Sequence, residues 1–330
     1  MNSFPNDGQP GFIQDPTRGR TAQDFISGRY PLPAQSPRVI AHDYQMPSTW
    51  QSTVGFQSEV GPQLGIEADL THWKGYHFGR QRDPNLFFNP TTGYNRNPNQ
   101  GRPDPAYTQI QWLESSGHAD YAAISSGLTR RFRNNWQASL NYTLMLFAHD
   151  DTTGFQYQGN NPFDPNAEWA RSTEFQRNTI RFNGIWRLPY TLTLSGAYLY
   201  GSGNYFSTTY SANPFGAGGT NRYVTAALTV NPVALDRFDG NSSYAIGEVI
   251  PRNALVGFPL HRIDVRLSKD LNLPRGVKLT GIAEVFNLAN HKNYGTYNAQ
   301  INSTTFGDPR QNLLNAYQPR VVQLAFKVSF

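Results

Sequence analysis

The strongest constraint on the fold of this chain is a strict alternation of apolar and polar residues. It is clearest in residues 322–330, where Val, Leu, Phe, Val and Phe alternate with Gln, Ala, Lys and Ser. A period of two is the pattern of a β-strand with one apolar face. That face must contact either a protein core or lipid, and the remaining sequence decides between the two.

The same period recurs along the chain, whereas helical periodicity is nearly absent, so we predict an all-β fold with about nine long antiparallel strands. Most stretches span about ten to twelve residues, which exceeds the ~5–6 usual in soluble sheets and matches the ~9–11 tilted residues that cross a bilayer. The expected strands are residues 49–60, 64–74, 119–132, 136–147, 177–188, 191–201, 260–272, 277–288 and 319–330.

The connections between these strands alternate between tight and long without exception. An outer-membrane β-barrel explains this order, because its periplasmic turns are short and its external loops are long. Segment 107–115 also alternates, and we expect it in a hairpin that protrudes from an external loop, since a further crossing would break the order. The tight turns are 61–63, 133–135, 188–191 and 273–276, and the long loops are 75–118, 148–176, 202–259 and 289–318.

Charged side chains in the middle of these strands keep to one face. In the last strand, Lys327 shares its face with Gln323, opposite Leu324. A Lys or Arg on the lipid face at the bilayer midplane costs about 2–4 kcal/mol, whereas a water-filled lumen accepts it. The same separation of charge from apolar residues holds in 64–74, 177–188, 260–272 and 277–288.

A soluble β-sandwich would show the same alternation, because one face of each strand would then pack into its core. Strand length and loop order favour the barrel, and so do aromatic residues near the strand ends, since aromatics form girdles at membrane interfaces. We therefore expect an antiparallel transmembrane β-barrel segment. The aromatic residues in question are Trp50, Trp73, Trp136, Trp186, Tyr190, Tyr198, Tyr200 and Phe330.

Composition excludes several other classes of protein. The chain has no cysteine, which excludes a disulfide scaffold and any Cys-based zinc or redox site. The net charge is +5, but Lys and Arg are spread along the sequence, so we expect no nucleic-acid partner. No run approaches the ~18 apolar residues of a membrane-spanning helix, and the first residues lack the basic and apolar parts of a signal peptide.

Nothing in the sequence marks a catalytic centre, and we expect no enzyme, no cofactor and no metal site. The seven histidines lack metal-ligand spacing, and there is no GxSxG motif. Residues 149–151 (HDD) offer a possible cation site, or a solvated group where a strand leaves the sheet. Residues 236–241 (DRFDGN) resemble a calcium loop without its ligand register, which favours a turn.

The long loops are rich in aromatic residues set among amides. These side chains would either stack on a ligand at the cell surface or pack against each other within large loops. The sequence leaves both alternatives open. The residues are Phe87, Phe88, Tyr94, Phe163, Trp169, Phe206, Tyr210, Phe215 and Tyr223.

Several stretches match the pattern of one membrane family. The most specific are DVRLSK at 264–269, EVFNLANH at 284–291, FG at 306–307 and PRVVQLAFKVSF at 319–330. They resemble the C-terminal end of TonB-dependent outer-membrane receptors of the Oar-like type. Residues 49–61, 120–143 and 192–207 are similar to mid-barrel hairpins of that family, although no proline follows Gly203 where the pattern has one.

The resemblance implies the C-terminal part of a barrel of about 22 strands with a plugged lumen. It also implies location in the bacterial outer membrane, with lipid as one partner. The assembly machinery for outer-membrane proteins would recognise the C-terminal strand, which ends at Phe330. An energy-coupling complex of the inner membrane would be a partner only if a plug and a TonB-contacting segment precede the chain.

We expect residues 1–48 to form an external, irregular segment and residues 49–330 to form a partial barrel. Nine crossings are an odd number, whereas a closed barrel in one bacterial chain needs an even number. Either a tenth strand lies within residues 20–45 or the chain is a fragment, and we favour a fragment that forms an open sheet, with 49–60 and 319–330 as its edges. The expected function is ligand uptake across the outer membrane when the barrel is complete. The alternatives are a surface-exposed binding or structural protein without transport, and a soluble all-β domain.

The two faces of the last strand should respond differently to a new charge. Leu324→Arg should reduce assembly in lipid strongly, because an arginine on the lipid face costs about 2–4 kcal/mol at the midplane, while Gln323→Arg should be tolerated. The measurement is the heat-modifiable, folded fraction after refolding into lipid vesicles. Equal losses for the two variants would contradict the assigned faces.

Overall fold

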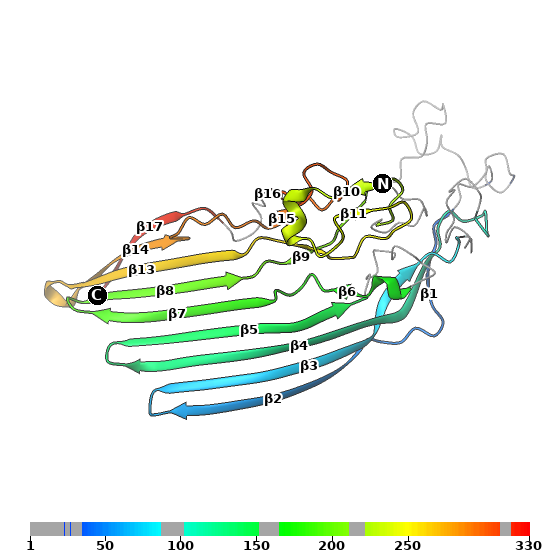
Figure 1. Cartoon of the computed structure of the whole chain (residues 1–330). Coiled ribbons are helices and arrows are strands. Elements are labelled where there is room, and N and C mark those ends of the chain that lie inside the picture. The colour runs from blue at the N-terminus through cyan, green and yellow to red at the C-terminus, as the bar shows by residue number, and fades with distance from the viewer. Residues whose placement is uncertain are drawn as a thin grey trace.

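The strands expected from the sequence form one large antiparallel sheet. A computed structural model describes residues 23, 27, 35–86, 102–151, 165–210, 222–310 and 318–330. Each long strand pairs with the next long strand along the chain, in the order β17-β14-β13-β8-β7-β5-β4-β3-β2 (Figure 1). These strands are β2 (Ser48–Val60), β3 (Leu64–Arg82), β4 (Gln111–Arg133), β5 (Trp136–Asp150), β7 (Asn178–Leu188), β8 (Leu192–Gly201), β13 (Leu260–Asn272), β14 (Lys278–Phe286) and β17 (Val321–Ser329).

The small strands and all but one of the 3-10 helices lie at the end of the sheet where the long connections emerge, and the remaining 3-10 helix lies in the tight turn between β13 and β14. Strand β1 pairs in parallel with the start of β4, and β6 pairs with the end of β5. The others form two-stranded sheets within the connections. The small strands are β1 (Arg38–Ile40), β6 (Ala170–Arg171), β9 (Tyr205–Phe206), β10 (Leu228–Thr229), β11 (Ser243–Tyr244), β12 (Leu255–Val256), β15 (Thr296–Tyr297) and β16 (Pro309–Arg310). The 3-10 helices are η2 (Pro165–Glu168), η3 (Pro232–Arg237) and η4 (Pro274–Gly276).

All nine predicted long strands are present, and most begin and end within a residue or two of the expected positions. The exception is the hairpin of β3 and β4, which continues past residues 74 and 119 to Arg82 and Gln111. Residues 111–115 of segment 107–115, which was expected in a protruding hairpin, lie in the β3–β4 hairpin as the first residues of β4 itself. Register shifts between Gly75 and Arg80 interrupt the alternation, so the sequence pattern does not show that β3 and β4 are continuous through them.

The four tight turns lie together at one end of the sheet, as predicted, and the long connections lie at the other (Figure 1). The β4–β5 turn places both Asn134 and Asn135 at positive φ, the conformation that a two-residue hairpin turn requires and that asparagine tolerates. The β7–β8 turn places Tyr190 and the β-branched Thr191 at positive φ as well. The Thr191 hydroxyl donates to the carbonyl of Asp270 at 2.5 Å and so ties this turn to β13.

Strand register gives the sheet one apolar and one polar face. Leu128, Leu140, Phe182, Tyr198 and Ile263 are successive cross-strand partners and make one row of the apolar face. A neighbouring row on the opposite face consists of Asp69, Ser125, Thr143 and Thr179. The predicted separation of faces is therefore present across the strands, since a shift by one residue would exchange the two sets.

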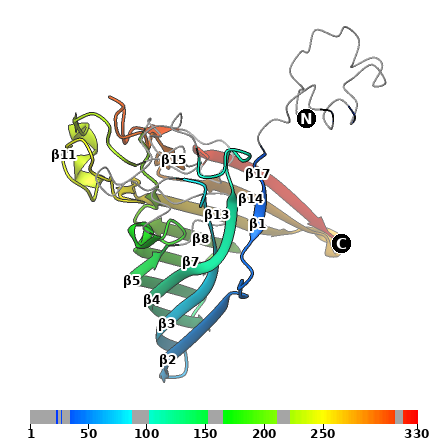
Figure 2. The same ribbon diagram turned by 90° about the vertical axis from the view of Figure 1, so that its right-hand side faces the viewer.

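The sheet does not close on itself. Figure 2 views it from one end and shows an arc that runs from β2 to β17. These two strands pair on one side only, as expected for the segments 49–60 and 319–330. Their apolar side chains are also bare, with 78% of Leu324 and 80% of Phe326 exposed. Within the described part of the chain, no helix is long and apolar enough to cross a membrane, which does not bear on crossing by strands.

Trypsin should distinguish the two ends of the sheet on intact cells. Arg275 in the β13–β14 turn and Lys292 in the connection after β14 are both exposed. They therefore differ mainly in that they lie at opposite ends of the sheet. Cleavage should occur after Lys292, and cleavage after Arg275 should require a permeabilised outer membrane. Mass spectrometry of the fragments is the measurement, and cutting at Arg275 in intact cells would contradict this topology.

Candidate functional site

The long connections build a folded cap at one end of the sheet. Two of them, 202–259 and 289–310, contribute to a hydrophobic core of their own, separate from the faces of the sheet. Phe238 and Phe306 meet edge to face at its centre, with ring centroids 5.4 Å apart. We refer to this structure as the loop cap. Its buried core residues are Tyr210, Val224, Val230, Ala234, Phe238, Tyr244, Ile250, Ala254, Leu255, Tyr297, Ile301 and Phe306.

The loop cap rests on the polar face of the sheet rather than on the apolar face. Tyr205 of the cap packs with Met145 and Ala148, which lie on the polar face of β5 near its end. On the neighbouring strand, Tyr121 packs against Phe175, with ring centroids 4.7 Å apart. The cap therefore covers the end of the surface that would line the inside of a barrel.

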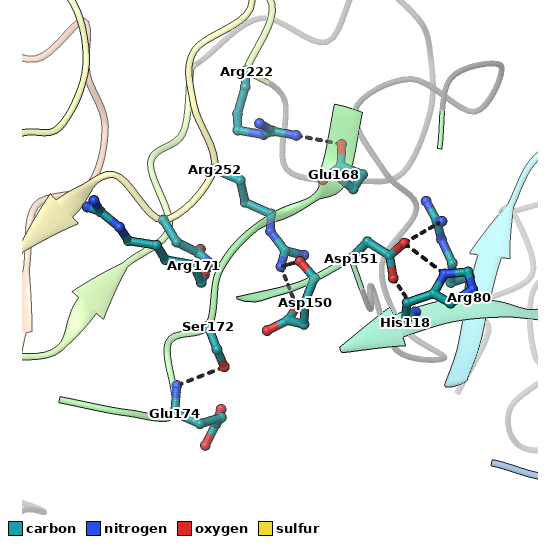
Figure 3. A network of polar contacts seen from close by, with 11 residues as sticks. Arg80, His118, Asp150, Asp151, Glu168, Arg171, Ser172, Glu174, Arg222 and Arg252 are labelled. Atoms are coloured by element: carbon teal, nitrogen blue, oxygen red, sulfur yellow. Dashed lines mark hydrogen bonds and ion pairs between the residues drawn. The ribbon is translucent and has the colours of Figure 1, made fainter. Parts of the chain in front are cut away.

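Two adjacent aspartates at the end of β5 form ion pairs, Asp150 with the cap and Asp151 with a neighbouring strand of the sheet (Figure 3). Asp151 forms an ion pair with Arg80 of β3 at 3.3 Å and accepts a hydrogen bond from the backbone of His118 at 2.5 Å. Asp150 forms an ion pair with Arg252, whose guanidinium also donates to the Asp150 carbonyl at 2.8 Å. Each carboxylate thus joins a different part of the chain to the same strand end.

These contacts match neither of the two readings of residues 149–151, a cation site or a solvated group. The aspartates are not solvated, because Asp151 is only 4% exposed and Asp150 is paired with Arg252. His149 does not join them, since it stacks on Trp169 with ring centroids 5.9 Å apart. In the part of the chain that the structure describes, no group of three or more His, Cys, Asp or Glu could hold a metal ion.

A third ion pair is more deeply buried. Arg222 and Glu168 approach to 2.5 Å, and they are 1% and 2% exposed. Arg222 also donates to the carbonyl of Ile250 at 2.9 Å. Burial lowers the pKa of Arg222, and the neighbouring Glu168 carboxylate opposes that shift. A buried pair of this kind holds two loops in one arrangement, because removal of either partner leaves an uncompensated charge.

The extended β3–β4 hairpin has a polar core of its own. Asp83 is fully buried and accepts hydrogen bonds from the backbone of Asn85 and Ile110 at 3.0 and 3.1 Å. Its other carboxylate oxygen pairs with Arg102 at 2.5 Å. These contacts anchor both ends of the connection between the two strands.

The aromatic loop residues mostly support the packing alternative where the structure describes them. Tyr210 and Tyr223 are buried, and Phe206 packs against the core of the cap. Trp169 is the exception, with 44% of its surface exposed. The remaining residues of this set, Phe87, Phe88, Tyr94, Phe163 and Phe215, lie outside the described residues.

Residues 236–241 comprise the end of a 3-10 helix, an isolated bridge between Phe238 and Leu255, and a bend at Gly240, rather than the simple turn that the sequence favoured. The 3-10 helix η3 ends at Arg237, and the Asp239 carboxylate that follows is used in an ion pair with Arg171. No sequence pattern predicts this pair, nor Arg222 with Glu168 or Arg252 with Asp150, because the partners are far apart in the chain.

The polar face below the cap carries charges suited to water. The carboxylates of Asp69 and Glu67 lie over Gly55 and Gly127 of the neighbouring strands, where a Cβ atom would meet them at 2.0 and 2.3 Å. Arg181 is exposed on the same face. Such side chains would be costly against lipid but can line a wet lumen. Among the described residues, the arrangement is a polar wall covered at one end by the loop cap.

Comparison with known proteins gives the same picture. The model of a family described as "Outer membrane beta barrel domain" matches residues 2–323. The outer membrane transporter YddB from Escherichia coli has a similar fold, with a TM-score of 0.52 and 10% identity, over 89% of this chain and 34% of YddB. No curated protein matches the sequence.

Two further solved structures match with lower TM-scores. The FrpB iron transporter from Neisseria meningitidis matches at 0.46 and 12% identity, over 88% of this chain and 32% of FrpB. The ferripyoverdine receptor of Pseudomonas aeruginosa also matches at 0.46 and 12%, over 86% of this chain and 27% of the receptor. This chain thus spans about a third or less of the solved structures that it matches.

The stability of the loop cap should depend far more on the buried pair of Arg222 and Glu168 than on an exposed ion pair of the sheet. Arg222→Met should destabilise the cap by about 3–5 kcal/mol, because Glu168 then stays buried and charged. Hydrogen exchange at the Val224 and Ile250 amides, which bond within the cap, should accelerate at least about 100-fold.

The matched control is Arg131→Met, which breaks the exposed pair with Glu59, whose side chains are 69% and 60% exposed. It should change exchange in the cap by less than about twofold, since exposed pairs contribute little and this one is remote. Adding Glu168→Gln to Arg222→Met should restore part of the protection. Unchanged exchange in Arg222→Met would show that the pair does not hold the cap.

Proposed function

This chain belongs to the outer membrane beta barrel domain family, and from that premise we propose that its nine strands form part of the wall of a larger barrel that takes up a ligand across the outer membrane. The family places the chain in the outer membrane, and its fold matches part of a solved outer-membrane transporter. Barrels and transporters of this kind are generally not enzymes.

The observation that carries the proposal is the pair of open edges on a two-faced sheet. Strands β2 and β17 each have one unpaired side, and unpaired backbone groups cannot be satisfied within lipid. Further strands must therefore pair with both edges, or the edges must pair with each other in an assembly. A barrel larger than nine strands leaves a lumen wide enough for the polar face to be wet.

The loop cap gives this wall a place for ligand recognition. It folds over the end of the polar face through Tyr205, Met145 and Ala148, so a ligand entering the lumen would pass beside it. Trp169 offers an exposed aromatic surface at the same end. We propose that ligand contact occurs at the cap and that movement through the lumen follows.

The type of receptor and its partners are part of the same proposal. The motifs at 284–291 and 319–330 support a TonB-dependent receptor of the Oar-like type. Such a receptor would use an energy-coupling complex of the inner membrane only if a plug and a TonB-contacting segment precede this chain. The C-terminal strand that ends at Phe330 would present itself to the barrel-assembly machinery.

The packed core of the loop cap favours a second function. Its hydrophobic core and buried ion pairs are those of a stable display surface, and a surface-exposed binding or structural protein would need no transport. The two functions differ in whether a bound ligand crosses the membrane.

Uptake by cells that carry the complete locus separates the two functions. Cells with the locus and cells with it deleted would be given a panel of labelled ferric chelates, oligosaccharides and peptides. Uptake predicts that one class accumulates only with the locus and that a proton uncoupler abolishes accumulation. Binding that survives the uncoupler, without accumulation of any class, would contradict transport and support the display function.

A further inference from the structure

The register of the last strand, β17, is not specified by its alternating residues. In the described sheet β17 pairs only with β14, and a long connection rather than a tight turn joins the two strands. A slip of β17 by one residue would exchange its two faces, but a slip by two residues would keep every apolar and polar side chain on its own face. The pattern alone therefore leaves such a slip open.

The side chains of β14 and β17 do not select one register either. The charged residues of β14 pair with β13 instead, Lys278 with Asp270 at 2.8 Å and Glu284 with Arg266 at 3.4 Å. The outward-facing residues of β17 are between 51% and 80% exposed, so packing does not distinguish one of them from the next. They are Val322, Leu324, Phe326 and Val328.

Asn287, directly after β14, holds the segment that leads into β17. Its side-chain N–H groups donate to the carbonyls of Gln318 and His291, each at 3.0 Å, and its side-chain oxygen accepts from the His291 amide at 3.1 Å. The residue is only 2% exposed, so this buried amide uses both its donors and its acceptor. The bond to Gln318 joins residues 31 positions apart.

Asn290 adds a second contact to the same segment. Its side-chain oxygen accepts a hydrogen bond from the backbone amide of Arg320 at 3.0 Å, one residue before β17 begins. Asn287 and Asn290 also have positive φ, 51° and 52°. Asparagine tolerates this conformation, and unlike glycine it brings an amide, so it meets both requirements at these positions.

Strand β13 gives these contacts a fixed base. The backbone amide of Asn287 donates to the Asp264 carboxylate at 2.9 Å, and Arg262 holds the same carboxylate at 2.8 Å. The amide of Leu288 donates to the carbonyl of Ile263 at 2.7 Å. Because β13 is paired on both sides, the residues after β14 have little freedom to move with β17.

We propose that Asn287 and Asn290 form an asparagine clamp that selects the register of β17 on β14. The clamp takes the place of a tight turn, because it holds residues 318 and 320 so that the first pair of the two strands is Val321 with Phe286. Since β17 is an edge strand, its register also decides which backbone groups it offers to a further strand. The clamp acts within this chain, so it can hold or fail independently of ligand uptake.

Disulfide cross-linking measures this register directly, because the chain has no cysteine of its own. Ala283→Cys would be combined in turn with Val322→Cys, Leu324→Cys and Phe326→Cys, and each chain would be refolded into lipid vesicles and oxidised. Leu324 is the direct partner of Ala283, and only direct partners bring Cβ atoms close enough for a disulfide. The pair with Leu324→Cys should cross-link at least about tenfold more than the other two.

Removal of the clamp should abolish this preference. Asn287→Gly with Asn290→Gly removes both side-chain amides but still accepts positive φ. The preference for Leu324→Cys should fall below about threefold, since each lost hydrogen bond is worth roughly a factor of five. Asn290→Asp keeps the accepting oxygen and should retain the preference, whereas Asn290→Gly alone should reduce it about fivefold.

The matched control is Asn134→Gly with Asn135→Gly in the β4–β5 turn, where both residues also have positive φ. It removes the same two groups away from β17 and should leave the preference unchanged. Each variant must first show the wild-type heat-modifiable band, and if the double glycine variant of the clamp fails to fold, Asn290→Gly against Asn290→Asp carries the test. An unchanged preference without the clamp, or an equal loss in the control, would overturn the proposal.

Discussion

The whole structure depends on the pairing of backbone groups between strands. Within lipid an unpaired N–H or C=O finds no water, so a spanning sheet must pair every strand on both sides. From β3 to β14 each long strand meets this requirement by pairing with its two neighbours in the sheet. β2 and β17 each pair with a neighbour on one side only, and the apolar side chains of these two strands are exposed as well. The sheet is therefore best understood as a wall that needs further strands.

The two faces of that wall place different chemistry on its two sides. On one face, rows such as Leu140, Phe182 and Tyr198 meet lipid. On the other face, carboxylates and hydroxyls are stable only against water. The loop cap adds a third environment, in which ion pairs such as Arg222 with Glu168 are buried within a small hydrophobic core.

The sequence predicted the wall much better than the cap. Alternation sets which residues of β13 and β17 share a face, and turn residues such as Asn134 and Asn135 end the strands sharply, so both can be read locally. The continuation of β4 to Gln111 was hidden because register shifts near Phe78 break the alternation. The cap could not be predicted, since pairs such as Arg252 with Asp150 join residues about a hundred positions apart and depend on the folded path of the loops.

Ion conductance of the purified 330-residue chain in a planar bilayer tests the central claim most directly. An open sheet with two unpaired edges encloses no pore, so the account predicts no reproducible conductance steps from this chain alone. Well-defined steps of constant size would show that β2 and β17 find partners within the chain or among its copies. That result would contradict the description of these strands as part of a larger wall.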